Sequence, residues 1–261
     1  KHNENILSFS ILSNYGNNKF ISMKKIVITG GTGRFGQILK SLRTKNKLYF
    51  PKRSELDITK LNSIKKYLKK TKPNILIHMA GLSRPMIIHE KNPSLSINLN
   101  IIGTSNIVLA CAEKNIKLVY FSTSYVYPGI KGNYYEDSGV NPSMNYAKSK
   151  LGGECAVSMY KNSLILRICM TEKPFKHSKA LYDAKTSFMY QEDLKDILFK
   201  IITKKGILNV GGKSQSIYSF AKKDNKKVKK IYLKNVKGLK FPKDSSINTN
   251  KLKKIIKKRS R

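Results

Sequence analysis

The stretch Lys24–Gly36, KKIVITGGTGRFG, decides the fold of this chain. Its β-branched run Ile26–Ile28 indicates a strand that is buried on both faces. Gly30, Gly33 and Gly36 follow, three residues apart, at the start of a predicted helix. The first glycine permits a tight turn, the second lets the backbone approach a pyrophosphate, and the third lets the helix pack closely against the strand. The stretch therefore predicts the phosphate-binding turn of a dinucleotide-binding fold.

Downstream of this turn, predicted strands and helices alternate along the chain. Apolar runs suited to strands cover 47–51, 74–78, 117–121, 163–168 and 206–210, and helical patterns cover 34–45, 57–70, 93–114, 145–160 and 191–203. In helix 93–114 we expect Ile97, Ile101, Val108 and Cys111 to face the core. Alternating strands and helices with crossover connections predict an α/β fold, a Rossmann-like doubly wound parallel sheet.

The order of the predicted elements divides the chain into three parts. Residues 23–168 form the predicted NAD(P)-binding Rossmann domain, and 169–261 form a small C-terminal substrate-binding part that is partly interleaved with it. Residues 1–22 begin with Lys and lack the pattern of a signal peptide, so we interpret them as a disordered or non-native extension before Met23. The lysine-rich run 251–258 is interpreted as the solvated face of a terminal helix.

The charge of the chain is extreme, with 52 Lys and Arg against 15 Asp and Glu and a net charge of +37. Only seven of the basic residues are Arg, and the lysines are spread along the whole chain. Surfaces evolved for nucleic acid usually use Arg for bidentate contacts. We therefore expect no specific nucleic-acid binding, and we expect the charge to attract anionic small molecules such as nucleotides.

The sequence pattern also bears on membranes, metals and location. No uninterrupted apolar run approaches the roughly 20 residues that cross a bilayer. The three cysteines lie far apart, without the spacing of a metal site, which suits reduced thiols in the cytoplasm. We therefore expect a cytoplasmic protein with no membrane partner and no metal.

The end of the second predicted strand bears on the choice of cofactor. Dinucleotide folds that prefer NAD place a carboxylate there, which binds the ribose 2′-hydroxyl. Here Lys52 and Arg53 take that place, and Arg34 adds a cation within the glycine turn. Cations suit a 2′-phosphate, so the sequence favours NADP(H) over NAD(H).

Tyr146 and Lys150 form the pair with the clearest chemical meaning, because residues four apart share one face of a helix. A phenol with its ordinary pKa of about 10 is a poor acid–base group at neutral pH. A nearby ammonium lowers that pKa, and a fall of three units requires about 4 kcal/mol. The pair follows a predicted cofactor-binding half and a Ser/Thr-rich strand end, which favours a catalytic pair over two unrelated surface residues.

Taken together, the motifs resemble those of an extended short-chain dehydrogenase/reductase, over roughly residues 23–256. Within that superfamily they are most similar to the branch of the dTDP-4-dehydrorhamnose reductases and other sugar-nucleotide reductases. The motifs that carry the resemblance are Thr29–Gly36, Leu56–Thr59, His78–Gly81, Asn100–Thr104, Ser122–Tyr127, Tyr146-x-x-x-Lys150, Phe188–Asp193 and Asn209–Gly212.

The resemblance implies a role for each matching residue. Tyr146 would be the general acid, Lys150 would hold the nicotinamide ribose and lower the pKa of the tyrosine, and Thr123 would hydrogen-bond the substrate oxygen. Asp57 would lie near the adenine amino group, a role that competes with capping the next helix. The implied cofactor-binding residues are Gly30, Gly33, Arg34, Phe35, Gly36, Lys52, Arg53, Asp57, Ile58, Ala80, Gly81, Asn100 and Lys150.

The resemblance implies an NAD(P)H-dependent reductase of a nucleotide-linked 4-keto sugar, which serves polysaccharide biosynthesis and forms a homodimer through the helix that bears Tyr146. After Thr123, related dehydratases carry Asp-Glu and rhamnose reductases Asp-Tyr, whereas this chain has Ser124-Tyr125. The stretch from Ile168 to Phe188 is shorter than in relatives, which suits a different sugar or a more open pocket. Two alternatives stay open: a sugar-nucleotide 4-epimerase that keeps its NAD bound, and a non-catalytic NADP-binding regulatory subunit.

Overall fold

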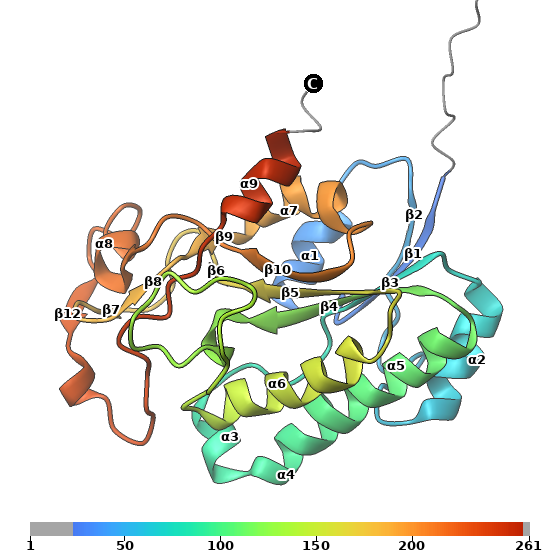
Figure 1. Ribbon diagram of the computed structural model, residues 1–261, viewed down its shortest axis with the longest axis horizontal. Helices are drawn as coiled ribbons and strands as arrows, with labels where there is room; N and C mark the ends of the chain where they lie inside the picture. Colours follow the sequence, from blue (N-terminus) through green and yellow to red (C-terminus); the bar gives the residue numbers. More distant parts are fainter. Residues whose placement is uncertain (1–22, 258–261) are drawn as a thin grey trace, which may run out of the picture.

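The computed structural model describes residues 23–257, so the predicted extension 1–22 lies outside the described residues. Six parallel strands form the central sheet in the order β10-β5-β4-β3-β1-β2 (Figure 1). The strand order reverses between β1 and β3, which creates a crevice at the carboxyl ends of these strands. The six strands are β1 (Lys25–Thr29), β2 (Lys47–Tyr49), β3 (Ile75–His78), β4 (Lys117–Thr123), β5 (Ser163–Ile168) and β10 (Gly206–Val210).

Helices cover both faces of this sheet (Figure 1), which confirms the predicted doubly wound α/β fold. One face carries α1 (Arg34–Lys40), α7 (Gln191–Ile201) and α9 (Asn250–Lys257). The opposite face carries α2 (Leu61–Thr71), α5 (Gly103–Glu113) and α6 (Asn145–Ser158).

The β-branched run in β1 is buried on both sides, as its composition predicts. Successive strand residues point to opposite faces of a sheet. Ile26 and Ile28 therefore enter the core beneath α1 and α7, and Val27 enters the core beneath α2 and α5. All three side chains are fully buried, so β1 anchors both layers and fixes the position of the glycine turn that follows it.

The helix predicted over 93–114 is interrupted in the structure. It consists of α4 (Pro93–Ser96), a π turn (Ile97–Ile102) and α5. The wider π turn changes the phase of the helix, so Ile97 is exposed and the prediction that it faces the core is wrong. The stretch from Pro93 to Glu113 has the length and composition of a membrane span, and in this fold α5 packs between α2 and α6.

Other predicted elements are shorter in the structure. Of the strand predicted over 47–51, only Lys47–Tyr49 (β2) forms a strand. Of the helix predicted over 34–45, only Arg34–Lys40 (α1) is helical. The lysine-rich terminal segment forms α9, in which Leu252 is buried and the four described lysines are exposed. Lys258 lies outside the described residues.

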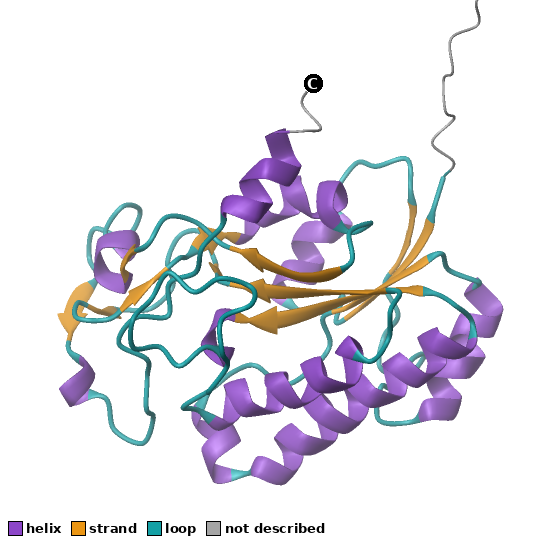
Figure 2. Ribbon diagram, viewed as in Figure 1, coloured by secondary structure: helices purple, strands orange, loops and turns teal. Residues whose placement is uncertain are grey.

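Short strands and long loops gather at the carboxyl end of the sheet, toward which the strand arrows point (Figure 2). Short helices also belong to this region, and in the sequence they precede and follow its short strands. These elements are α3 (Ile87–Lys91), β6 (Met170–Thr171), β7 (Lys179–Leu181), β8 (Lys185–Thr186), β9 (Met189–Tyr190), β11 (Gln215–Ser216), α8 (Ile217–Ala221) and β12 (Lys229–Ile231), with 3₁₀ turns at Ser124–Val126 and Leu233–Asn235.

Candidate active site

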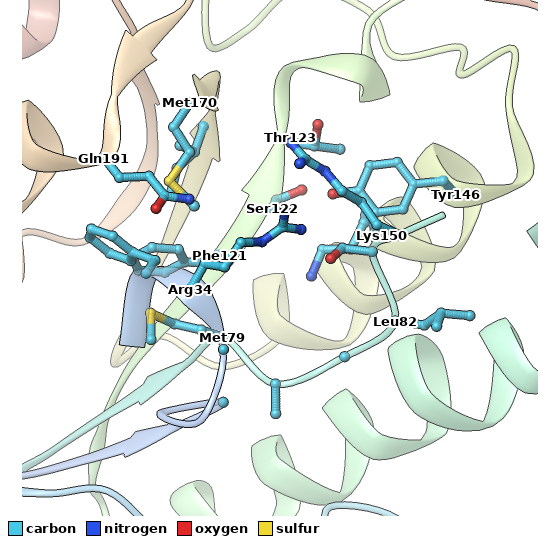
Figure 3. Close-up of a pocket in the computed structure, with 18 of the residues that line it drawn as sticks. Arg34, Met79, Leu82, Phe121, Ser122, Thr123, Tyr146, Lys150, Met170 and Gln191 are labelled. Atoms are coloured by element: carbon cyan, nitrogen blue, oxygen red, sulfur yellow. The ribbon is translucent and has the colours of Figure 1, made fainter. Parts of the chain in front are cut away.

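A cavity of about 450 Å³ lies at the carboxyl ends of β1, β3, β4 and β5. Ligands of open α/β sheets bind at this position. Figure 3 shows Thr123, Tyr146 and Lys150 on one side of the cavity, with the Arg34 side chain extending toward them from the other side. The predicted site residues that line it are Gly30, Gly33, Arg34, Phe35, Gly36, Ala80, Gly81, Thr123, Tyr146 and Lys150.

The three glycines of the turn play different structural parts. Gly30 has φ +75°, and a Cβ there would lie 2.7 Å from the backbone nitrogen of Ala80. A Cβ on Gly36 would lie 2.5 Å from the Cα of Gly31, so the first turn of α1 packs directly on the loop. Gly33 is less crowded, with its nearest neighbour at 3.2 Å. The first and third glycines are therefore required by packing, and the second leaves its backbone open to the cavity.

A second, smaller cavity of about 160 Å³ adjoins the glycine turn and holds Arg53, Asp57 and Ile58. The Asp57 carboxylate accepts hydrogen bonds from the backbone and the hydroxyl of Thr59, which lower its pKa, and it lies 3.5 Å from the Arg53 guanidinium. Asp57 does not cap the next helix, because α2 takes Lys60 as its N-cap. Gly30, Ala80 and Gly81 line both cavities, which are therefore adjacent.

The three cations predicted to meet a 2′-phosphate do not gather in the structure. Arg53 borders the smaller cavity, whereas Lys52 is exposed and lines neither cavity. Arg34 points into the larger cavity and pairs with the carboxylate of Glu172. The grouping of Arg34 with Lys52 and Arg53 is therefore wrong, because the first residue of α1 faces the opposite side of the glycine turn.

Tyr146 lies on the first turn of α6, and its phenol lies near the Thr123 hydroxyl, which acts to lower the pKa of Tyr146. Burial raises the pKa of Tyr146, and the Thr123 contact and the charge of Arg84 only partly offset this. The His89 ring packs edge-on against the Tyr146 ring, with centroids 5.1 Å apart. The phenol is thus held in place and stays protonated at neutral pH, which suits a proton donor.

Lys150 lies one helical turn further along α6, and its ammonium sits 4.2 Å from the centre of the Tyr120 ring. Burial lowers the pKa of Lys150 to about 7, although the carboxylate of Glu154 opposes the shift. Lys150 is not among the groups that lower the pKa of Tyr146. The expected lowering of the tyrosine pKa is therefore absent, because burial outweighs the nearby charges.

Asn100 lies in the π turn and is buried, away from both cavities. Its side chain accepts a hydrogen bond from Leu82 N–H at 2.8 Å and donates to Leu82 O and to Ser149 Oγ, each at 2.9 Å. Asn100 therefore fastens the loop after β3 to α6, and it stands behind the cavity wall rather than in it.

Three residues of the cavity region escape sequence reasoning. Arg84 lines the cavity, Glu172 binds Arg84 and Arg34, and Ser122 has a buried hydroxyl with no hydrogen-bond partner. Arg84 had a usable signal, since an Arg in the loop after a strand is rare in a chain whose cations are mostly Lys. Within residues 23–257, no group of three His, Cys, Asp or Glu could hold a metal ion.

Comparison with known protein families shows to which family the chain belongs. The family model described as "RmlD substrate binding domain" matches residues 23–171, more than half of the chain. The chain belongs to this family. The match begins at Met23 and includes the glycine turn, Thr123, Tyr146 and Lys150.

Curated relatives fall into two kinds. A dTDP-4-dehydrorhamnose reductase of Aggregatibacter actinomycetemcomitans is 31% identical over 154 residues, which cover 57% of this chain and 52% of the relative. Methionine adenosyltransferase 2 subunit beta of Xenopus tropicalis is 31% identical over 143 residues, which cover 51% of this chain and 42% of the relative. The chain thus spans about half or less of the length of these relatives.

Solved structures resemble the chain over a longer stretch. A dTDP-4-dehydrorhamnose reductase of Bacillus anthracis in complex with NADP has a TM-score of 0.79 and 26% identity, and the likeness covers 89% of this chain and 91% of that one. These findings confirm the Rossmann-like fold and the resemblance to the dTDP-4-dehydrorhamnose reductases.

Proposed function

We propose that this chain uses NADPH to reduce the carbonyl group of a nucleotide-linked 4-keto sugar, as an oxidoreductase of the dTDP-4-dehydrorhamnose reductase type. The observation that carries the proposal is the convergence of Thr123, Tyr146 and Lys150 in one cavity bordered by the glycine turn. The family match and the similarity to dTDP-4-dehydrorhamnose reductases support the same reaction class.

Proton donation is the part of the reaction that falls to the protein's own residues. Because burial raises the pKa of Tyr146, the phenol keeps its proton at neutral pH and can give it to a carbonyl oxygen that gains negative charge. The hydroxyl of Thr123, which lines the same cavity beside that phenol, can donate to the same oxygen. A protonated tyrosine favours reduction over the reverse reaction.

The two adjacent cavities support the proposal that a dinucleotide binds along the glycine turn. A Cβ on Gly81 would lie 2.5 Å from Asn100 Oδ1, so the backbone forms the cavity wall without a side chain. The buried Ser122 hydroxyl is available to a ligand in the cavity, and Lys150 can hold a ribose hydroxyl. A bound nicotinamide supplies the hydride.

The preference for NADPH rests on Arg53, the cation that borders the smaller cavity. Similarity to a reductase crystallised with NADP supports a nicotinamide cofactor. A role in making nucleotide-linked sugars for polysaccharides would place the protein in the cytoplasm, together with its soluble substrate and cofactor.

The decisive experiment measures NADPH oxidation with a panel of nucleotide-linked 4-keto sugars. Tyr146→Phe should lower the rate by at least about 100-fold, because general acid catalysis contributes that much or more. Tyr182→Phe, which alters an exposed tyrosine outside the cavity, should leave the rate unchanged. Full activity of Tyr146→Phe would refute the proposed proton donor.

A second candidate is a non-catalytic, NADP-binding regulatory subunit. The similarity to methionine adenosyltransferase 2 subunit beta favours it. Tight NADPH binding with no oxidation on any sugar of the panel would support this candidate over the reductase.

A further inference from the structure

Two arginines from different loops bind one buried carboxylate beside the cavity. Arg84 Nη1 lies 3.1 and 3.2 Å from the two carboxylate oxygens of Glu172, and Arg34 Nη1 contacts the first of them. Arg34 opens α1 after the glycine turn, Arg84 follows the Gly81–Ser83 loop, and Glu172 directly follows β6. The cluster therefore joins three segments around a single anion.

The two sides of this cluster differ in exposure. The Arg34 and Arg84 side chains are 55% and 34% exposed and line the cavity, whereas the Glu172 side chain is 9% exposed. Burial raises the pKa of Glu172, but the charges of Arg84 and Arg34 outweigh it and the net shift is downward. An ionised carboxylate thus balances only one of two guanidinium charges that face the cavity.

Paired guanidinium groups are suited to an anion with several oxygens. Each planar group can form two parallel hydrogen bonds to phosphate, and these are stronger than bonds between neutral groups. A diphosphate carries more charge and more acceptor oxygens than a carboxylate, so it can bind both arginines where Glu172 satisfies them only partly.

We propose that Arg34 and Arg84 form a binding site for a diphosphate group, and that Glu172 competes with the diphosphate for them. The proposal rests on the proposed function, since both the dinucleotide cofactor and a nucleotide-linked substrate carry this group. Glu172 thereby sets the affinity of the cavity for its ligand: binding exchanges an internal ion pair for a new one.

The test uses inorganic pyrophosphate and isothermal titration calorimetry on the full chain. Glu172→Gln keeps the size of the side chain but removes its charge, and it should tighten pyrophosphate binding by about tenfold. Glu113→Gln is the matched control, because it makes the same change at an exposed carboxylate paired with Lys65 and Lys114. Its affinity should equal that of the unaltered protein.

A second variant keeps the proposal testable if Glu172→Gln does not fold. Arg84→Gln alters a partly exposed side chain and should weaken pyrophosphate binding by about tenfold. Unchanged affinity in either folded variant would overturn the proposal.

Titrations with NADPH and with dTDP then identify the source of the diphosphate. A gain for NADPH alone in Glu172→Gln assigns the site to the cofactor, and a gain for dTDP alone assigns it to the substrate. A gain for neither would overturn the proposal. Sugar reduction is measured separately, so failure of the reductase hypothesis is read from the turnover assay and failure of this proposal from binding.

Discussion

At the scale of single residues, Tyr146 and Lys150 show how burial tunes a pair of neighbouring groups. Burial raises the pKa of the phenol and lowers that of the ammonium, so it favours the neutral form of both. The tyrosine becomes a better-defined proton donor at neutral pH. The lysine lowers the stability of the fold, because burial disfavours its charged form. With a pKa of about 7, about half of the Lys150 side chains are neutral at pH 7 in the folded protein.

This penalty predicts that Lys150→Met stabilises the fold. At pH 6 we expect a gain of about 1 kcal/mol or more, as when other buried charges are replaced by apolar groups. The folded-state pKa of about 7 lies below the unfolded value of roughly 10.4. The penalty is therefore full below pH 7 and shrinks as the pH rises toward 10. Urea unfolding at pH 6 and pH 9 measures the difference.

Lys148→Met is the control for this experiment, because Lys148 lies on the same helix and is exposed. It should change stability little at either pH. A Lys150→Met protein that is less stable than the unaltered one at pH 6 would show that the contact with Tyr120 outweighs the burial of the charge.

At the scale of elements, the π turn between α4 and α5 has a local purpose that periodicity does not reveal. It directs Asn100 toward Leu82 and Ser149, so one side chain ties the loop after β3 to α6. The loop forms one wall of the cavity and α6 carries Tyr146. The turn thus fixes the position of the cavity-lining loop relative to the helix that bears Tyr146.

Asn100→Ala should destabilise the protein by about 1 kcal/mol, because it leaves the partly buried N–H and C=O of Leu82 without partners. Hydrogen exchange at Leu82 N–H should accelerate. Asn98→Ala, at an exposed position in the same turn, is the matched control and should have little effect. Equal exchange rates in the two variants would show that Asn100 does not hold the loop.

The sequence was informative where the signal was local. The β-branched run before Gly30 predicted the glycine turn, and the four-residue spacing of Tyr146 and Lys150 predicted that both lie on one helix face at the cavity, because both features depend on neighbouring residues. Glu172 could not be found this way, since its partners lie 138 and 88 residues away. Arg34 was assigned to the wrong neighbours because the sequence does not show on which side of the turn the helix begins.

At the scale of the whole molecule, a buried ion pair between β5 and α6 is the centre of a hydrogen-bond network that reaches β10. Arg167 on β5 pairs with Glu154 on α6 at 2.8 Å, and both side chains are at most 6% exposed. Arg167 also donates to the Tyr127 hydroxyl, which donates to Asn209 on β10. Four segments therefore depend on one charged centre.

Glu154→Gln should destabilise the protein by about 3 kcal/mol, because it leaves the buried Arg167 without its counter-charge. The double variant Glu154→Leu with Arg167→Met should recover most of this loss, since neither of these two positions then carries a buried charge. Urea unfolding of the single and double variants measures both effects. A double variant no more stable than the single one would contradict this account.

Arginine and lysine residues occupy different kinds of position in this molecule. Four arginines each pair with a carboxylate: Arg34, Arg53, Arg84 and Arg167. In three of these pairs, the side chain of the acidic partner is at most 9% exposed. Most lysines are instead exposed along the surface. The lysine-rich charge therefore reflects the overall composition, whereas four of the five arginines in residues 23–257 lie where a carboxylate fixes their geometry.

The place of β10 at the edge of the sheet has a consequence for the order in which the protein matures during synthesis. β5 pairs on its outer side with β10, and Leu164 and Leu166 share a core with α7 and α9, which follow later in the chain. While a ribosome still translates these segments, a nascent chain that already contains Thr123, Tyr146 and Lys150 exposes an unpaired strand and an apolar face. Such surfaces favour aggregation, so a stalled or truncated product should require a chaperone until α9 emerges.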